Sequence, residues 1–85
     1  MPFVVTIAPS ALLELDDLPD PVQRHFKKAF TMLQENPFRP RPGLDVMKMH
    51  GGAYRVHVGR YRGMYAVQEN EIVFFRFGHR SMVYR

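Results

Sequence analysis

Residues 54–77, with the sequence YRVHVGRYRGMYAVQENEIVFFRF, decide the fold of this 85-residue chain. The stretch is rich in β-branched and aromatic residues, which are typical of strands. Two short turn-forming pairs, Gly59-Arg60 and Glu69-Asn70, divide it into three runs. Because turns this short join neighbouring antiparallel strands, the stretch predicts an antiparallel β-meander. The expected strands cover residues 53–58, 62–68 and 71–77.

The first half of the chain predicts a helical hairpin that packs on this sheet. An apolar run at residues 3–8 reads as an N-terminal strand. Ser10 is a suitable N-cap for a short helix over residues 10–18. Asp20-Pro21 combines a capping residue with a proline at the first helical position, which predicts a second helix that ends near Asn36-Pro37. One apolar stripe follows the second helix, formed by Val22, Phe26, Phe30 and Leu33.

The middle of the chain links the hairpin to the meander. Residues 37–43 contain three prolines and a glycine, so we expect an irregular connector. Residues 45–50 form a short candidate strand that is closed by Gly51-Gly52. The predicted order is β-α-α-β-β-β-(β), an α+β fold in which the helical hairpin covers one face of a small sheet.

Composition indicates one globular domain that spans residues 1–85. Hydrophobic residues make up 46% and aromatic residues 13% of the chain, which are ordinary values for a folded protein. The absence of cysteine excludes disulfides and thiolate metal sites. The N-terminal apolar run is too short for a signal peptide, and no stretch approaches the ~20 apolar residues of a membrane span. We therefore expect a soluble, cytoplasmic protein without a membrane partner.

Positive charge is concentrated in the second half of the chain. Residues 1–36 hold three Lys/Arg and five Asp/Glu, whereas residues 37–85 hold nine Lys/Arg and three Asp/Glu. The net charge of the two parts is therefore −2 and +6. This asymmetry is typical of a surface that binds a polyanion. On charge alone, a solvated basic surface that has no partner is the better interpretation, because a basic isoelectric point is common in small proteins.

Strand alternation predicts where the cations of the meander lie. Because successive side chains point to opposite faces, Arg55 and His57 should share the face that is not covered by the helices. Strict alternation groups Arg62 with Met64, Ala66 and Gln68, and Arg76 with Ile72 and Phe74. If Arg62 and Arg76 join Arg55 and His57, several cations share one open face. Like charges that lie opposite one another destabilise a sheet, so such a cluster indicates an anionic ligand such as phosphate.

The C-terminal residues extend this surface. Gly78 permits a sharp change of direction, after which His79, Arg80 and Tyr84 are expected to fold over the rim of the same face. The planar guanidinium of arginine binds phosphate through two hydrogen bonds. The tyrosine ring can stack on a base and offer a hydroxyl group. These residue types point to a nucleic acid as the polyanion.

The run 54–65, followed by Phe77-Gly78-His79-Arg80 and by Val83-Tyr84-Arg85, resembles the RelE/ParE toxin superfamily of bacterial and archaeal toxin–antitoxin systems. The N-terminal strand, the helical hairpin and the length fit as well, so the resemblance covers nearly the whole chain and implies a RelE-like fold. RelE-type members are ribosome-dependent endoribonucleases that cut mRNA in the A site and so inhibit translation. ParE-type members inhibit DNA gyrase. A third possibility is an inactive relative that binds only its antitoxin or RNA.

The resemblance also implies roles for individual residues. Arg55 and His57 stand where RelE-type toxins have two lysines. Arg62 and Arg80 match two arginines that bind phosphate, and Tyr84 matches a C-terminal tyrosine. The retained arginines and tyrosine favour the nuclease over the gyrase inhibitor. The implied partners are a cognate antitoxin, the ribosome and mRNA.

Metal-free RNA cleavage uses the ribose 2′-OH as the nucleophile, so the site needs a base, a positive charge beside the phosphorane and a proton donor for the 5′-oxygen. We assign His57 as the base, kept neutral by neighbouring arginines that lower its pKa, with His79 as a rival acid or base. Arg62 and Arg80 would hold the scissile phosphate, Arg55 would support them, and Tyr84 would orient the nucleotide. DNA should be inert because it has no 2′-OH. We expect no metal or cofactor, and outer RNA contacts from Lys48, Arg60, Arg76, His79 and Arg85.

Overall fold

The computed structural model describes residues 2–83, with side chains for residues 2–81. The α+β fold class and the predicted order β-α-α-β-β-β-(β) are confirmed, and a short helix that was not predicted follows the last strand. The elements are β1 (Val4–Ile7), α1 (Pro9–Asp16), α2 (Asp20–Glu35), β2 (Asp45–Lys48), a 3₁₀ turn (His50–Gly52), β3 (Tyr54–Val58), β4 (Tyr61–Gln68), β5 (Glu71–His79) and α3 (Arg80–Val83). Within the described part of the chain, no helix is long and apolar enough to cross a membrane.

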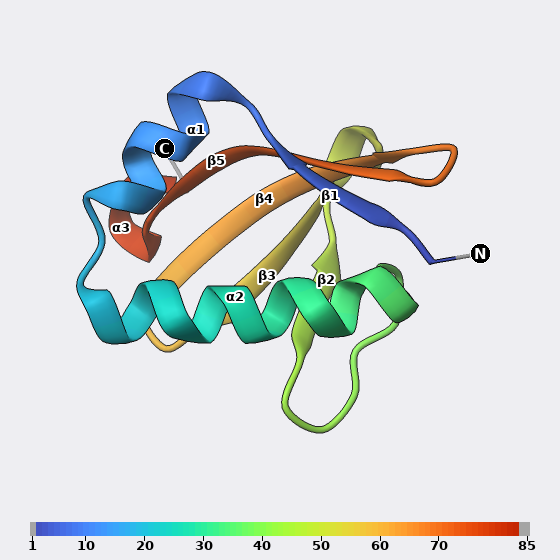
Figure 1. Cartoon of the computed structure of the whole chain (residues 1–85), viewed down its shortest axis with the longest axis horizontal. Helices are drawn as coiled ribbons and strands as arrows, with labels where there is room; N and C mark the ends of the chain where they lie inside the picture. The colour runs from blue at the N-terminus through green and yellow to red at the C-terminus, as the bar shows by residue number, and fades with distance from the viewer. Residues whose placement is uncertain (1, 84–85) are drawn as a thin grey trace.

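The five strands form one mixed sheet in the order β1-β5-β4-β3-β2. The predicted antiparallel meander is confirmed, since β2, β3, β4 and β5 pair with one another in sequence. The first strand joins the other edge and runs parallel to β5, with Val4 opposite Glu71. In Figure 1, α2 lies across one face of the sheet and α1 lies at the end of β5.

Both helices begin earlier than predicted, α1 by two residues and α2 by one residue. The N-cap of α1 is Ala8, not Ser10, and the N-cap of α2 is Pro19, not Asp20. Neither helix has a side-chain cap hydrogen bond. Each helix instead carries a proline in its first turn, where the fixed φ of proline suits the helix and its missing N–H costs nothing.

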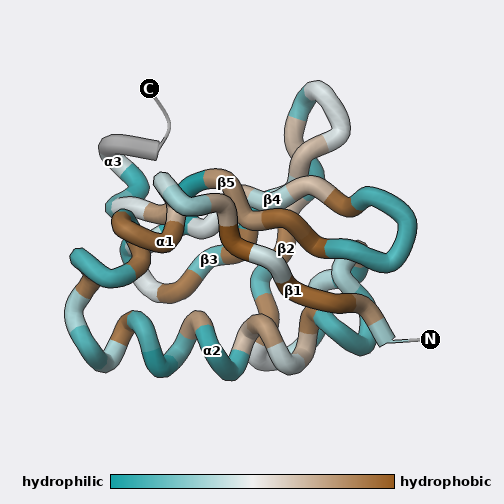
Figure 2. Tube along the Cα trace, turned by 45° about the horizontal axis from the view of Figure 1, so that its top comes forward, coloured by the Kyte–Doolittle hydropathy of each residue, from teal (hydrophilic) through white to brown (hydrophobic). Residues whose placement is uncertain are grey.

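The core lies between α2 and the sheet. The predicted apolar stripe of α2 is confirmed, because Phe26 and Leu33 are fully buried and Val22 and Phe30 are partly buried against them. The Phe26 ring meets the Phe77 ring edge-on, with 5.1 Å between ring centroids. Figure 2 shows the matching pattern, with hydrophobic stretches in β1 and β5 and alternating hydropathy along α2.

A β-bulge in β5 changes which residues face the helices. Met64 pairs with Arg76 but Tyr65 pairs with Phe74, so Phe75 is an extra residue that is 41% exposed. Phe74 and Phe77 therefore both enter the core, where their rings stack at 5.0 Å. The strict alternation that grouped Arg76 with Phe74 is wrong, because the bulge moves Arg76 to the open face.

Candidate functional site

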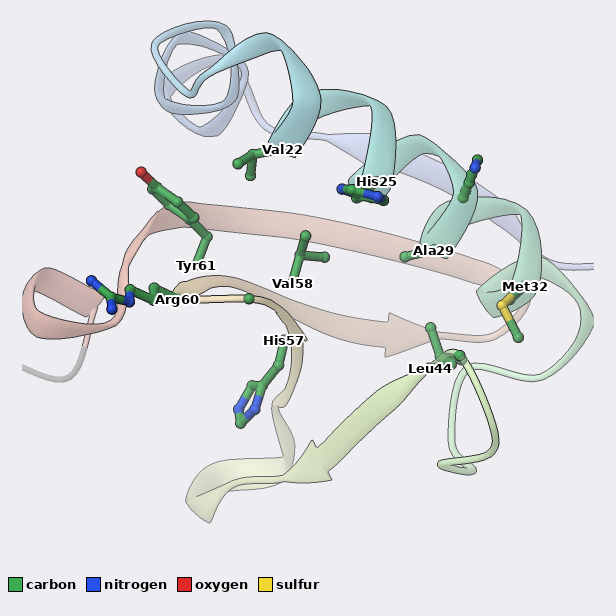
Figure 3. A pocket seen from close by; sticks show the side chains of 12 residues that line it. Val22, His25, Ala29, Met32, Leu44, His57, Val58, Arg60 and Tyr61 are labelled. Carbon is green, nitrogen blue, oxygen red and sulfur yellow. The ribbon is translucent and has the colours of Figure 1, made fainter.

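A row of paired residues crosses the sheet on the face away from α2. His57 of β3 lies directly opposite Arg62 of β4 and, on its other side, opposite Asp45 of β2. Gly78 of β5 ends the row opposite Arg62. Figure 3 shows the His57 ring directed away from α2, whereas Val58 points toward the helix. The predicted placement of Arg62 beside His57 is confirmed by this register.

His57 lies in an asymmetric environment. Its Nδ1 atom is 3.0 Å from Oδ2 of Asp45, and its side chain is 17% exposed. Its Nε2 atom is buried and meets no hydrogen-bond partner among the described residues. Burial and the nearby Arg62 charge lower the pKa of His57 below its usual 6.5, against an upward contribution from Asp45. The lowered pKa favours the neutral imidazole near pH 7, and the Asp45 carboxylate lies on the Nδ1 side of the ring.

Arg62 is held firmly at the end of the β3–β4 hairpin. Its side chain is only 7% exposed, which is rare for a charged residue. Nη1 donates hydrogen bonds to the backbone oxygens of Gly59 at 3.1 Å and Tyr61 at 3.0 Å. These bonds fix one edge of the guanidinium against the hairpin turn. The positive charge beside His57 therefore has a defined position.

Two more predicted cations occupy the neighbouring row of the same face. Arg55 lies opposite Met64, and Met64 lies opposite Arg76, so both arginines are on the His57 side of the sheet. Nη2 of Arg55 lies 2.8 Å from Sδ of Met47. Nε of Arg76 lies 4.0 Å from the Glu14 carboxylate, which offsets part of its charge. The open face thus gathers Arg55, His57, Arg62 and Arg76.

The structure places two other candidates on the α2 side of the sheet. Lys48 pairs with Tyr54, whose ring stacks on the core residue Tyr65. His79 pairs with Tyr61, and the two rings meet edge-on at 5.5 Å. The expectation that His79 folds over the rim of the His57 face is wrong, because alternation after Phe77 returns His79 to the helix side.

Two further candidates, Arg60 and Arg80, lie on segments that a backbone hydrogen bond joins. Arg60 is exposed in the β3–β4 turn, and Arg80 is exposed at the start of α3. The backbone N–H of Arg80 donates to the Arg60 carbonyl at 2.8 Å, which joins the turn to α3. Arg80 follows Gly78, the last residue of the His57 row, by two positions. Tyr84 and Arg85 lie outside the described residues.

A separate groove of about 640 Å³ lies between α2 and the β3–β4 hairpin. Figure 3 shows Val22, Ala29 and Met32 reaching into it from the helix, opposite Val58 and Tyr61 of the strands. Its floor is apolar. Its polar lining residues include His25, Lys28, Arg60 and Tyr61, and His57 borders it with the ring directed away from α2. The groove therefore combines apolar contact area with positive charge.

Comparison with known proteins places the chain in a family. The model of the family described as ParE toxin of type II toxin-antitoxin system, parDE, matches residues 5–84. The chain belongs to the RelE/ParE superfamily of toxins. No curated protein sequence matches this RelE/ParE toxin.

Solved structures share the fold of this RelE/ParE toxin. The RelB-RelE antitoxin-toxin complex from Methanococcus jannaschii contains a chain that is 26% identical, with a TM-score of 0.76 and coverage of 93% of this chain and 94% of that one. A chain of the RelE-RelB complex from Pyrococcus horikoshii OT3 is 27% identical, with a TM-score of 0.77 and coverage of 96% of this chain and 99% of that one. A mutant of E. coli toxin RelE in the free state is 23% identical, with a TM-score of 0.80 and coverage of 99% of this chain and 92% of that one. It shares the same fold.

Sequence reasoning missed Asp45, the residue of this toxin that contacts His57. The sequence placed Asp45 at the start of a strand but did not give the register between β2 and β3. That register depends on the 3₁₀ turn at His50–Gly52, where Gly51 adopts φ 80°, and not on a standard two-residue hairpin turn. Within residues 2–83, no group of three or more His, Cys, Asp or Glu side chains could hold a metal ion.

Proposed function

We propose that this toxin is a metal-independent endoribonuclease that acts in the cytoplasm and cuts mRNA in the ribosomal A site. The observation that carries the proposal is the direct cross-strand pairing of His57 with Arg62, with Arg55 on the same face. A neutral base and fixed cations are the groups that 2′-OH attack on a phosphodiester requires. The likeness to archaeal chains named RelE supports the same activity.

In the proposed reaction, Nε2 of His57 takes the proton of the ribose 2′-OH as the 2′-oxygen attacks phosphorus. Arg62 and Arg80 hold the phosphate and stabilise the added negative charge of the phosphorane, and Arg55 supports them. The bond from phosphorus to the 5′-oxygen then breaks, and the leaving oxygen takes a proton from water. The products are a 2′,3′-cyclic phosphate and a 5′-hydroxyl. Tyr84 orients the nucleotide.

The closed geometry of the site supports dependence on the ribosome. Arg62 is 7% exposed, and Nε2 of His57 is covered. RNA binding must therefore move the groups that lie over these atoms before cleavage begins. A large partner that holds both the toxin and the mRNA can supply the binding free energy for that change. Free RNA in solution offers fewer contacts and should be cut slowly.

Primer extension on mRNA that is being translated with the purified toxin tests this proposal. We expect cuts spaced by codons with the wild-type toxin and at least a 100-fold slower cleavage with His57→Gln, since a positioned base contributes about 10²–10⁴-fold. Arg62→Ala should also abolish cleavage. Thermal unfolding of each variant shows whether the fold survives, which matters most for the buried Arg62. Cleavage that persists in folded His57→Gln contradicts the assignment of the base.

The matching family is described as ParE toxin, and the resemblance to ParE-type members implies an alternative, inhibition of DNA gyrase. A gyrase inhibitor acts by protein contact and does not need a neutral His57 opposite Arg62. Gyrase-linked DNA breaks in the presence of the toxin, without codon-spaced mRNA cuts, would establish this alternative. If the toxin produces neither codon-spaced mRNA cuts nor gyrase-linked DNA breaks, it is an inactive relative that binds only its antitoxin or RNA.

We also propose a cognate antitoxin as a protein partner, docked in the groove between α2 and the hairpin. The solved relatives from M. jannaschii and P. horikoshii are complexes with RelB. An amphipathic segment with acidic residues fits the apolar floor and the basic rim. In binding experiments with the neighbouring-gene product, Lys28→Glu should weaken the complex more than Lys27→Glu, an exposed control outside the groove lining. Equal effects of the two changes would place the antitoxin elsewhere.

A further inference from the structure

We infer that Asp45 is a positioning residue that fixes the tautomer of His57 and so directs its lone pair to Nε2. The consequence for catalysis rests on the proposed nuclease function, whereas the tautomer itself does not. Asp45 is the first residue of β2 and His57 is the fourth residue of β3. The two are direct cross-strand partners.

The contact between the two side chains has the geometry of a hydrogen bond. Oδ2 of Asp45 lies 3.0 Å from Nδ1 of His57, inside the range for N–H···O bonds to a carboxylate. A carboxylate can only accept a hydrogen bond, so Nδ1 must carry the proton. The Asp45 side chain is 65% exposed, while the His57 side chain is 17% exposed. Asp45 thus anchors the ring from its solvent side.

The opposite nitrogen of the ring shows why this anchor matters. Nε2 is buried and has no hydrogen-bond partner among the described residues, so its surroundings do not select a tautomer. Neutral histidine can carry its proton on either nitrogen. Only the Asp45 contact leaves Nε2, the nitrogen away from Asp45, as the proton acceptor. Without Asp45, a share of the molecules would carry the proton on Nε2 and could not act as the base.

Charges from three strands bear on His57. Arg62 of β4 and Arg55 of β3 disfavour the protonated ring, and Asp45 of β2 favours it. Removing the Asp45 charge leaves both arginines in place, so the pKa of His57 should fall further. Asp45 thus sets two properties of His57, namely which nitrogen accepts a proton and how basic that nitrogen is.

Heteronuclear NMR of the imidazole ¹⁵N atoms tests the inference without any assay of cleavage. We expect wild-type His57 to carry its proton on Nδ1. In Asp45→Ala we expect a mixture of tautomers and a lower pKa for His57. Asp17→Asn, which removes an exposed carboxylate charge at the end of α1, should leave both unchanged. A proton on Nε2 in the wild type, or an unchanged tautomer in Asp45→Ala, overturns the inference.

The pH dependence of cleavage tests the catalytic consequence. In Asp45→Ala, which removes the acceptor of the Nδ1 proton, kcat should fall by about 10-fold to 100-fold with little change in KM, because the loss concerns a base that contributes about 10²–10⁴-fold. The ascending limb of the pH–rate profile should move to lower pH. If kcat and the profile stay unchanged, Asp45 does not position a catalytic base. If the tautomer changes as expected but the wild-type toxin cuts no mRNA, the nuclease proposal fails and the Asp45 assignment stands.

Discussion

Oε1 of Glu14 in α1 accepts a hydrogen bond from the backbone N–H of Phe77 in β5 at 3.0 Å. The N–H belongs to the edge of the sheet just beyond the end of β1, whose pairing with β5 stops at Phe74. A helix side chain therefore satisfies a donor that a longer β1 would have paired. The same carboxylate lies 4.0 Å from Arg76 on the open face. Glu14 thus links the position of α1 to the end of the candidate site.

Substitutions at Glu14 should separate the hydrogen bond from the charge. Glu14→Ala should lower the free energy of unfolding by about 1 kcal/mol, since the Phe77 N–H loses its acceptor. Glu14→Gln keeps an acceptor oxygen and loses only a weak, half-exposed ion pair, so a change below about 0.5 kcal/mol is expected. Urea unfolding measures both, with Glu35→Ala as the surface control. Equal losses in the two Glu14 variants would assign the stabilisation to the ion pair.

Gly63→Ala should destabilise the core by overpacking. A Cβ at this position would lie 2.9 Å from Phe74, 3.0 Å from Phe77 and 3.2 Å from Phe26. Insertion of a methyl group into such a space costs about 1–3 kcal/mol. Urea unfolding measures the loss, and Phe77→Leu in the same chain should recover part of it by making room. Strictly additive effects of the two substitutions would show that the added methyl group does not meet the Phe77 ring.

Tyr65→Phe tests a buried polar contact between the sheet and the connector. The fully buried Tyr65 hydroxyl donates a hydrogen bond to the Pro37 carbonyl at 2.6 Å. Its removal leaves that carbonyl without its donor and should cost about 1–2 kcal/mol in chemical unfolding. A variant as stable as the wild type would mean that water replaces the hydroxyl.

The same residue predicts behaviour in alkaline solution. Burial raises the pKa of Tyr65 above its ordinary value of 10.0, so the folded protein keeps the ring neutral while the unfolded chain ionises. The wild type should therefore lose stability as the pH rises above about 10, and Tyr65→Phe should lose less. Unfolding curves at pH 9 and 11 measure the two slopes. Parallel slopes would exclude Tyr65 as their source.

His57 predicts the opposite pH dependence on the acid side. Its lowered pKa means that the unfolded chain takes up a proton more readily than the folded protein. Stability should therefore be highest above about pH 6.5 and decrease as the pH falls toward 5. His57→Gln should show a smaller decrease, whereas His50→Gln, an exposed control, should keep the wild-type decrease. A full decrease in His57→Gln would assign it to other groups.

The meander and the helices could be predicted from the sequence because short turns and apolar spacing are patterns among neighbouring residues. The pair Gly59-Arg60 marks one turn, and the apolar spacing from Phe26 to Leu33 marks the buried side of α2. Pairing between residues that are far apart in the sequence could not be predicted. The parallel pairing of β1 with β5 depends on residues about 67 positions apart. The bulge at Phe75 is hidden because the run Phe74-Phe75 fits either face of a strand.

The residues of the candidate site also fall into those that local patterns placed and those that depend on long-range pairing. Alternation placed Arg55 and His57 together, and the short turn at Gly59-Arg60 brought Arg62 opposite His57. His79 was expected to fold over the rim after a sharp turn at Gly78, but β5 continues through His79, so its side chain returns to the helix side. Asp45 depended on pairing across the 3₁₀ turn, for which the sequence has no simple rule.

The pairing of β1 with β5 sets an order of events during synthesis. Residues 4–7 are synthesised well before their partners in the sheet, residues 71–74. Contacts between such distant segments form late in folding, and the sheet stays incomplete until they do. The described candidate residues from Asp45 to Arg80 also belong to the later part of the chain. The five-stranded sheet that carries the candidate site therefore reaches its final form only after the β5 strand has been synthesised.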